Sequence, residues 1–477
     1  MCGLEVEVKD GRVERIRGDK LDPFSRGFIC PKGAVLDKLH TDPDRLRRPM
    51  VKDGDGQWRE VDWSEAFETV AKGLGAVIGR GDRNAVGVYL GNPNVHNLDN
   101  GLYMRPLLKS LGTRNVFTAS TVDQIPRHVS CGLMYGGAGL IPVPDLDRTS
   151  HLLMLGANPL VSNGSLCSAP DFPGRLKALR QRGGRLVVVD PRRTRTAERA
   201  DEHLFIRPGT DAFFLTAMIH TLFEEGLVVD DEVLSVVQGV DAVRSAVAPL
   251  TPEAVASVCG VGAQTIRRQA RDLAAAPSAA VYGRIGNHAT VFGTLTSWAA
   301  DVLNILTGNL DRPGGVMFPQ AAHMPPQGKA GGRGFALGRW RSRVRGWPEA
   351  MGELPVATLA EEIEVEGPGQ LRALVTVAGN PARSTPNSAR LEKALSTLEF
   401  MVSVDPYLNE TTRYADVILP PPSHLERPHY DLAFTSLAVR NVARFSEALF
   451  EAPGPSESEI LSRLALIAAG QPYDADT

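Results

Sequence analysis

Hydrophobic and polar residues follow two different periodicities along the chain. Residues 5–8 and 13–17 alternate with period two on either side of a Lys-Asp-Gly turn, which predicts a β-hairpin. After residue 62, short apolar runs alternate with stretches of helical periodicity, including 211–225 and 294–306. The apolar runs predict strands at 86–90, 151–155, 186–189, 280–282, 374–377 and 401–404. Near-continuous apolar strands separated by helices are typical of α/β domains whose parallel sheets are covered on both faces.

Composition narrows the functional class. The 477 residues carry a net charge of -3, and only 6% of them are aromatic, so neither a basic field nor stacking platforms for nucleic acid are expected. Five cysteines are too few and too scattered for a secreted disulfide framework. Apolar runs stay well below the roughly 18 residues of a membrane span, and the first residues resemble no export signal. We therefore expect a cytoplasmic protein without a membrane span.

Several predicted strands end in turns built from Gly, Asn, Asp and Pro. These turns are Gly156-Ala157-Asn158-Pro159, Asp190-Pro191, Gly283-Arg284-Ile285-Gly286-Asn287, Gly379-Asn380-Pro381 and Asp405-Pro406. In open α/β sheets, ligands bind beyond the carboxyl ends of the strands. Glycine there admits a ligand close to the backbone, and Asn and Asp offer partners to a base or ribose. Two Gly-x-Asn-Pro turns and two Asp-Pro turns predict two related nucleotide-like sites on one chain.

Two charged segments have more than one interpretation. The run 192–201 is either a solvated charged surface or a pyrophosphate contact, because Arg binds phosphate oxygens through paired bonds. Arg207-Pro208-Gly209-Thr210-Asp211 opens a predicted helix and offers a second anion site. The Gly-, Pro- and Arg-rich stretch 312–345 is either a linker or a binding loop, and its arginines at 333–345 are compatible with an anionic substrate.

Taken in order, the motifs resemble those of a known family. They are Cys30-Pro31-Lys32-Gly33, Gly156-Ala157-Asn158-Pro159, Asp190-Pro191-Arg192-Arg193-Thr194, Arg207-Pro208-Gly209-Thr210-Asp211, Thr307-Gly308-Asn309, Pro313-Gly314-Gly315, Gly379-Asn380-Pro381 and Tyr414-Ala415-Asp416-Val417-Ile418-Leu419-Pro420. The ordered set resembles the molybdopterin oxidoreductases of the dimethyl sulfoxide reductase superfamily, which includes formate dehydrogenases and nitrate reductases. The resemblance covers essentially the whole chain.

The resemblance implies a fold and its division into domains. It implies a small N-terminal β-rich unit of iron–sulfur type at residues 1–55, followed by two parallel-sheet α/β domains, one inserted in the other. The outer domain would comprise 56–124 and 330–405, and the inserted Rossmann-like domain 125–329. Residues 406–477 would form a return segment before a C-terminal pterin-binding domain that this chain lacks.

The resemblance also implies a cofactor, bis-molybdopterin guanine dinucleotide with molybdenum or tungsten, near a [4Fe–4S] cluster. The protein would position and tune that cofactor. The residues assigned to one guanine dinucleotide half are Gly156, Asn158, Asp190, Arg192, Gly209 and Asp211. Those assigned to the other half are Gly286, Asn287, Asn380 and Asp405.

The cluster motif is incomplete in this chain. By resemblance, Cys2 and Cys30 match the third and fourth cluster ligands, whereas a cluster normally needs four. We interpret Met1 as an internal methionine of a longer protein in which a Cys-x2-Cys segment precedes Cys2; the other interpretation is that Cys2 and Cys30 are ordinary cysteines. Lys32 would lie between cluster and pterin and aid electron transfer.

The protein ligand to the metal is expected after the first α/β segment. Asp123 is the first choice, because a carboxylate suits an oxidised metal. Cys131 is the second choice, and its alternative role is that of a small buried hydrophobe. A metal without a protein ligand is the third possibility. His128 is either a proton relay or a surface histidine.

Three hypotheses for function follow. In the first, the chain is a molybdenum or tungsten oxidoreductase performing two-electron chemistry on a small molecule such as formate or an oxyanion. Electrons would pass through the cluster to a partner subunit or carrier. In the second, it is a non-catalytic electron-transfer or scaffold subunit of a respiratory complex. In the third, it is an inactive fragment. The sequence leaves the substrate and the choice of metal open.

Overall fold

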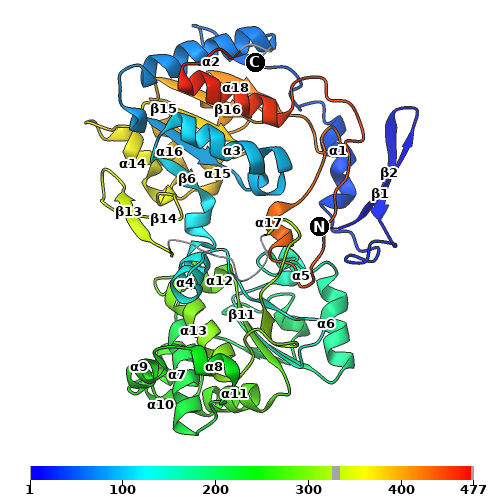
Figure 1. Cartoon of the computed structure of the whole chain (residues 1–477), viewed down its shortest axis with the longest axis vertical. Coiled ribbons are helices and arrows are strands. Elements are labelled where there is room, and N and C mark those ends of the chain that lie inside the picture. Colours follow the sequence, from blue (N-terminus) through cyan, green and yellow to red (C-terminus); the bar gives the residue numbers. More distant parts are fainter. Residues whose placement is uncertain (1, 325–333, 474–477) are drawn as a thin grey trace.

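The computed structural model describes residues 2–324 and 334–473. Two α/β blocks lie one above the other in Figure 1, and a two-stranded ribbon stands beside them. The ribbon is the expected hairpin, β1 (Leu4–Lys9) paired antiparallel with β2 (Arg12–Gly18). It leads through a loop to a short helix, α1 (Leu36–Thr41).

The upper block contains a seven-stranded sheet in the order β4-β3-β17-β16-β15-β5-β6. Its parallel part consists of β5 (Val86–Leu90), β6 (Val116–Thr118), β15 (Ala373–Val377), β16 (Phe400–Val404) and β17 (Val417–Leu419). Two antiparallel strands, β3 (Met50–Lys52) and β4 (Trp58–Glu60), extend one edge. One face packs on α2 (Trp63–Ile78), α3 (Leu98–Leu111) and α18 (Glu457–Ala469), and the other on α14 (Leu359–Glu364) and α16 (Ser388–Leu395).

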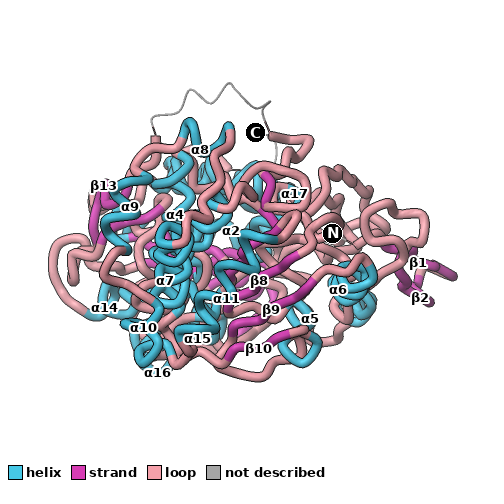
Figure 2. Tube along the Cα trace, turned by 90° about the horizontal axis from the view of Figure 1, so that it is seen from below, coloured by secondary structure: helices cyan, strands magenta, loops and turns pink. Residues whose placement is uncertain are grey.

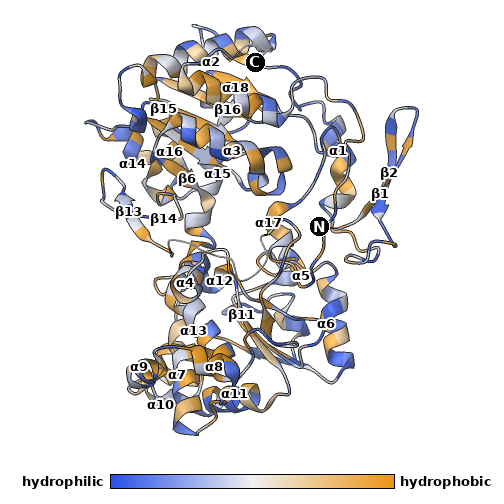
Figure 3. Ribbon diagram, viewed as in Figure 1, coloured by the Kyte–Doolittle hydropathy of each residue, from blue (hydrophilic) through white to orange (hydrophobic). Residues whose placement is uncertain are grey.

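The lower block contains a four-stranded parallel sheet in the order β10-β9-β8-β11. Its strands are β8 (His151–Leu155), β9 (Arg185–Val189), β10 (Glu202–Leu204) and β11 (Ala279–Gly283). Figure 2 shows α6 (Phe172–Gln181) on one side of β8–β10, and α7 (Asp211–Glu224) and α11 (Ala263–Ala275) on the other. Hydrophobic residues gather along these strands and along α7, as Figure 3 shows. Every strand expected from the apolar runs is present.

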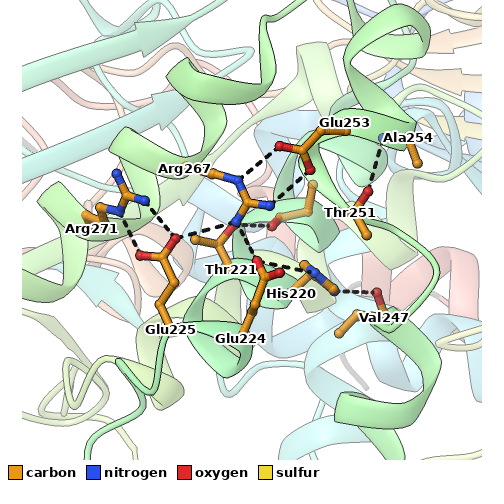
Figure 4. Close-up of polar contacts among 11 residues, drawn as sticks. His220, Thr221, Glu224, Glu225, Val247, Thr251, Glu253, Ala254, Arg267 and Arg271 are labelled. Carbon is orange, nitrogen blue, oxygen red and sulfur yellow. Dashed lines mark hydrogen bonds and ion pairs between the residues drawn. The ribbon is translucent and has the colours of Figure 1, made fainter.

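An ion-pair network fastens the helices on one face of this smaller sheet (Figure 4). The guanidinium of Arg267 on α11 donates to both carboxylate oxygens of Glu253, 3.1 and 2.9 Å away, on α10 (Pro252–Cys259). It also reaches Glu224 and Glu225 at the end of α7. Arg271 donates to both oxygens of Glu225 at 2.7 and 2.9 Å. The network joins three helices without touching the strand ends.

The larger sheet crosses two of the domain limits expected from the sequence. β3 lies in the 1–55 unit and β17 in the 406–477 segment, yet Val51 and Val417 pair within the same sheet. The stretch 312–345 contains more than a loop, because β13 (Leu337–Arg341) pairs with β14 (Pro348–Ala350). Arg333, at the start of the expected anion-binding run, lies outside the described residues.

No helix among the described residues is long and apolar enough to cross a membrane. The expected cytoplasmic location stays a prediction.

Candidate functional site: two strand-end crevices on one cleft

The strand order reverses direction once in each parallel sheet. From β8 the chain moves to β9 on one side and later to β11 on the other. From β5 it moves to β6 on one side and later to β15 on the other. Beyond the carboxyl ends of such strand pairs, the connections diverge to opposite faces and leave a crevice in which ligands bind. The chain therefore has two equivalent crevices, at β8/β11 and at β5/β15.

The β8/β11 crevice is formed by a close approach of two backbones. Gly286 donates its backbone N–H to the carbonyl of Gly156 at 3.0 Å. Gly156 has φ +54°, and a Cβ there would lie 2.6 Å from the backbone nitrogen of Asn287. Only glycine fits at this position. Asn287 is fully buried, and neither atom of its side-chain amide has a hydrogen-bond partner among the described residues.

The β5/β15 crevice repeats this approach with other residues. A Cβ on Gly91 would lie 1.7 Å from the carbonyl oxygen of Ala378, and a Cβ on Gly379 would lie 2.5 Å from the ring of Tyr89. Asn94 bridges the two strand ends, because its amide donates to the carbonyls of Gly91 and Val377 at 2.9 and 2.7 Å. Our sequence interpretation missed this half of the crevice. Its signal was a third Asn-Pro, in Gly91-Asn92-Pro93, directly after a predicted strand.

Both crevices contain the same hydrogen-bonded arrangement of a threonine and an asparagine. Thr196 donates its hydroxyl proton to Asn158 Oδ1 at 2.8 Å, and its oxygen accepts from the backbone of Leu160. Thr411 donates to Asn380 Oδ1 at 2.6 Å, and its oxygen accepts from the backbone of Ala382. In both cases the threonine lies in the loop that follows the neighbouring strand, and its hydroxyl holds the Asn-Pro turn that contains Asn158 or Asn380. The two related sites expected from the sequence thus share geometry as well as motif.

The structure corrects the expected division of residues between the two sites. Gly286 and Asn287 were expected to join Asn380 and Asp405. They lie instead against Gly156, because β11 pairs in parallel with β8 along its whole length. That division was wrong because strand pairing, not order along the chain, decides which loops meet.

Each crevice is bordered by a buried carboxyl group. Burial, and secondarily the charge of Asp190, raises the pKa of Asp211 to about 6. Burial likewise raises the pKa of Asp405 to about 6. N–H donors of a bound ligand would stabilise the charged form of such a carboxyl group. The side chain of Arg192 is exposed beside Asp190, whose carboxylate accepts the backbone N–H of Arg192 at 2.8 Å.

A cleft of about 1070 Å³ lies between the blocks. The expected site residues that line it are Cys2, Cys30, Lys32, Asp123, His128, Gly156, Asn158, Asp190, Arg192 and Gly286. The expected residues that do not line it are Gly209, Asp211, Asn287, Asn380 and Asp405. The second crevice opens on the cleft through Asn92 and His96.

Asp123 lies in the cleft wall, where the two α/β blocks meet. Arg284, at the end of β11, donates to its carboxylate and also to the hydroxyl of Ser165 at 2.7 Å. His128 is half-buried in the same wall, and its Nδ1 hydrogen-bonds the carbonyl of Ala138 at 2.8 Å. Burial lowers the pKa of His128, so the imidazole favours its neutral form. These contacts place His128 in the cleft and not on the outer surface.

Cys131 is enclosed in a small apolar cluster with Ile141, Leu166 and Leu437. Burial raises the pKa of its thiol to about 12. A thiol must ionise to bind a metal, so these surroundings oppose a ligand role. They fit the alternative, a small buried hydrophobe.

Cys2 and Cys30 lie together at one end of the cleft, with Lys32. Burial raises the pKa of the Cys2 thiol, and the neighbouring Cys30 raises it further. Gly3 is held by the hydroxyl of Ser25 at 2.9 Å, which fixes the segment that carries Cys2. Among the described residues, no three or more His, Cys, Asp or Glu side chains are grouped for a metal ion.

Sequence comparison identifies the family. Residues 45–458 match the family described as molybdopterin oxidoreductase, and residues 1–41 match the molybdopterin oxidoreductase Fe4S4 domain. The chain belongs to the molybdopterin oxidoreductases. Membership implies molybdopterin and a [4Fe–4S] cluster as the prosthetic groups of this fold.

Several curated relatives are similar to this molybdopterin oxidoreductase chain over most of its length. The F420-dependent formate dehydrogenase subunit alpha of Methanocaldococcus jannaschii is 27% identical over 88% of this chain and 62% of its own length. Formate dehydrogenase H of Escherichia coli is 27% identical over 94% and 64%. The thiosulfate reductase molybdopterin-containing subunit of Salmonella typhimurium is 26% identical over 89% and 57%. The chain thus spans less than two thirds of the length of these relatives.

A solved structure confirms the fold. Acetylene hydratase from Pelobacter acetylenicus superposes with a TM-score of 0.81 over 98% of this chain and 68% of its own, at 22% identity. The N-terminal unit and the two parallel-sheet blocks therefore share their fold with that enzyme.

The site residues fit a molybdopterin nucleotide on chemical grounds. The unpartnered amide of Asn287 offers both a donor and an acceptor, and the close approach of Gly156 and Gly286 leaves no side chain over the crevice. Buried polar groups without partners are costly, so such an amide is typical of a site completed by a ligand. The cluster ligands fit in part, since this chain supplies two thiols.

Proposed function

We propose that this chain is the catalytic subunit of an oxidoreductase that binds one bis-molybdopterin guanine dinucleotide with molybdenum or tungsten. One observation supports the proposal. The two strand-end crevices, each with a threonine hydroxyl that donates to an asparagine side chain, open on a single cleft. A cofactor with two nucleotide tails needs two such crevices and one shared cavity. A one-nucleotide ligand would leave the second crevice without a role.

The first crevice would hold one guanine dinucleotide. Its residues in this assignment are Gly156, Asn158, Asp190, Arg192, Gly209, Asp211, Gly286 and Asn287. Gly209 and Asp211 open α7 beside Asp190, where a helix N-terminus favours anions. The guanidinium of Arg192 is free to contact a phosphate, because no side-chain hydrogen bond or ion pair occupies it among the described residues.

The second crevice would hold the other dinucleotide. Asn380 and Asp405 border it, and Gly91 joins them because β5 stands beside β15 as β11 stands beside β8. Asn380 is already held by Glu410 at 2.9 Å and by Thr411. It therefore shapes the turn, while the carboxyl of Asp405 remains the group that can accept N–H donors of a base.

Asp123 would be the protein ligand to the metal, which when bound supplies two-electron redox chemistry. Arg284 holds the Asp123 carboxylate in the cleft wall through an ion pair. His128 keeps its Nε2 available for a proton, because Nδ1 is committed to the carbonyl of Ala138. We propose His128 as the proton relay beside Asp123.

Cys2 and Cys30 would provide two of the cluster ligands, and Lys32 would lie between cluster and pterin. Electrons would then leave through a partner subunit or carrier, as the name "subunit alpha" of the methanogen relative suggests for that protein. We propose formate or an oxyanion as the substrate class, because the relatives are named formate dehydrogenase and thiosulfate reductase.

Cofactor content tests the proposal against the scaffold and fragment hypotheses. The full chain is produced in a host that makes the cofactor, purified, and assayed for metal and for guanine nucleotide released by acid. We expect one molybdenum or tungsten and two guanine nucleotides per chain. A folded chain that contains neither would contradict the proposal and favour a non-catalytic subunit. Oxidation of formate and reduction of nitrate or thiosulfate with artificial electron carriers would then assign the substrate.

A further inference from the structure

Glu353 is a cleft residue to which none of the assignments above gives a role. It follows the β13–β14 hairpin and lines the cleft together with Ser120 and Asp123. Most of its side chain is shielded by the cleft walls. Shielding a carboxyl group from water is unfavourable, because desolvation of its charged form costs free energy. The presence of one in this place therefore calls for an explanation.

The backbone holds Glu353 rigidly. Its N–H and C=O exchange two hydrogen bonds of 3.0 Å with Ala350, which closes a tight turn directly after β14. The next residue, Leu354, is buried and donates to the carbonyl of Val116 on β6 at 2.9 Å. Met351, within this turn, has φ +57°, a conformation that non-glycine residues rarely adopt. The carboxyl is thus fixed in the wall and is not a mobile surface group.

A single hydrogen bond orients the carboxyl group. Thr118 Oγ1 accepts the backbone N–H of Ser120 at 3.0 Å and lies 2.5 Å from Glu353 Oε2. Since a hydroxyl has one proton, Thr118 donates it to Oε2. The other oxygen, Oε1, has no partner among the described residues and is accessible from the cleft. One oxygen is therefore anchored, and the other is free to bond to a molecule in the cleft.

The nearby cations are already paired. The ionisable groups on the elements packed around Glu353 are Tyr89, Asp123, Arg339, Arg341, Glu349, Glu361 and Glu362. Arg284 binds Asp123, Arg339 binds Glu349, Arg341 donates to the carbonyl of Gly346, and the phenol of Tyr89 bonds to Ser384. Since no cation among the described residues pairs with Glu353, burial dominates and raises the pKa of Glu353 to about 7. Both protonation states are therefore populated at neutral pH.

We propose that Glu353 exchanges protons with the molecule that reacts in the cleft. The neutral carboxyl gives the proton on Oε1 to an acceptor atom of that molecule. The carboxylate that remains keeps its bond from Thr118 and regains a proton from water, so no electrons are transferred. The proposal rests on the proposed function only in requiring that a reacting molecule occupies the cleft.

Infrared difference spectroscopy tests the proton-binding state directly and needs no cofactor. The carboxylic C=O band of the purified chain is followed from pH 5 to 9 in wild type, Glu353→Gln and Glu353→Asp. The exposed Glu366→Gln, with the same charge change, is the control. Asp211 and Asp405 should contribute components with midpoints near pH 6 in every variant. We expect a further component that disappears with a midpoint near pH 7, missing in Glu353→Gln and kept in Glu353→Asp and in the control. A Glu353→Gln spectrum with the same pH 7 component as wild type overturns the proposal.

The pH profile of turnover tests whether the exchanged proton enters the reaction. In the cofactor-loaded enzyme, Glu353→Gln should lower kcat about 100-fold, at the lower end of what proton transfer by a side chain contributes. The limb of the kcat-against-pH profile that lies near pH 7 should disappear, while the content of metal and guanine nucleotide stays unchanged. Thr118→Val should move that limb to higher pH, because the carboxylate loses its donor. An unchanged limb in Glu353→Gln overturns the proposal. Absence of cofactor would contradict the proposed function alone, since the infrared titration still stands.

Discussion

Arg284 and Asp123 form an ion pair between the two α/β blocks. Arg284 follows β11 of the smaller sheet, and Asp123 follows η4 (Ala119–Val122), just after β6 of the larger sheet. The pair thus closes one wall of the cleft at the residue proposed to bind the metal.

Asp123→Asn should lower the metal content while leaving the guanine nucleotides bound, because the amide is a poorer metal ligand than a carboxylate and no longer forms the ion pair with Arg284. Arg284→Gln should reduce metal content partially, since the carboxylate remains but is less well held. Metal per chain by mass spectrometry measures both. Cys131→Ala is the matched control and should retain full metal content, because its thiol is buried and neutral. If Cys131→Ala loses the metal and Asp123→Asn keeps it, the ligand assignment is reversed.

Asn287→Leu should stabilise the cofactor-free chain and abolish nucleotide retention at the first crevice. The buried amide has no partner, and such a group costs about 1–3 kcal/mol. Denaturant unfolding of the cofactor-free chain should show this gain. Asn304→Leu is the control: both atoms of that amide bond to Val281, at 2.9 and 3.1 Å, so the change should destabilise. If Asn287→Leu destabilises the cofactor-free chain instead, this would argue against an Asn287 amide that finds its hydrogen-bond partners in a bound ligand.

Asp211→Asn should change how the stability of the cofactor-free chain depends on pH. The folded-state pKa of Asp211 is raised to about 6, so folding favours the neutral carboxyl. Its contribution is complete below the unfolded pKa and is lost as pH rises through about 6. Between pH 4 and 7, wild type should lose on the order of 1–3 kcal/mol from this group, and the Asn variant should not. Parallel unfolding curves for the two proteins would contradict this.

Thr196→Val and Thr411→Val should each weaken retention of guanine nucleotide. Each removes one hydrogen bond that holds a Gly-x-Asn-Pro turn, about 1 kcal/mol or roughly fivefold in affinity. Nucleotide release during dialysis measures the effect. Thr69→Val is the control, because its hydroxyl bonds only to the carbonyl of Glu65 within α2. A loss in one crevice variant but not the other would break the equivalence of the two crevices.

The strands could be predicted because buried parallel strands are nearly continuous apolar runs, and 151–155 and 373–377 are such runs. The pairing of β3 with β17 could not, because these strands have three residues each and the pairing joins Val51 to Val417. No local pattern encodes a contact over that separation. The expected limits at 55 and 405 therefore miss strands that belong to the larger sheet.

Some residues of the cleft could be predicted from the sequence, but their arrangement could not. Gly156, Asn158 and Asp190 follow recognisable turns and do line the cleft. The position of Gly286 depends on which strand lies beside β8, and that strand, β11, pairs with positions that are 128 residues earlier in the chain. Glu353 carries no motif at all. Its role emerges only from the hydrogen bond that Thr118, far away in the sequence, donates to it.

The central claim is that both crevices serve one metal cofactor in the shared cleft. Anomalous diffraction at the molybdenum and tungsten edges, from crystals of the purified full chain, tests this most directly. The account predicts one metal peak in the cleft beside Asp123, with nucleotide density running from it into both the β8/β11 and the β5/β15 crevices. A metal peak elsewhere, or nucleotide density in only one crevice, would contradict it.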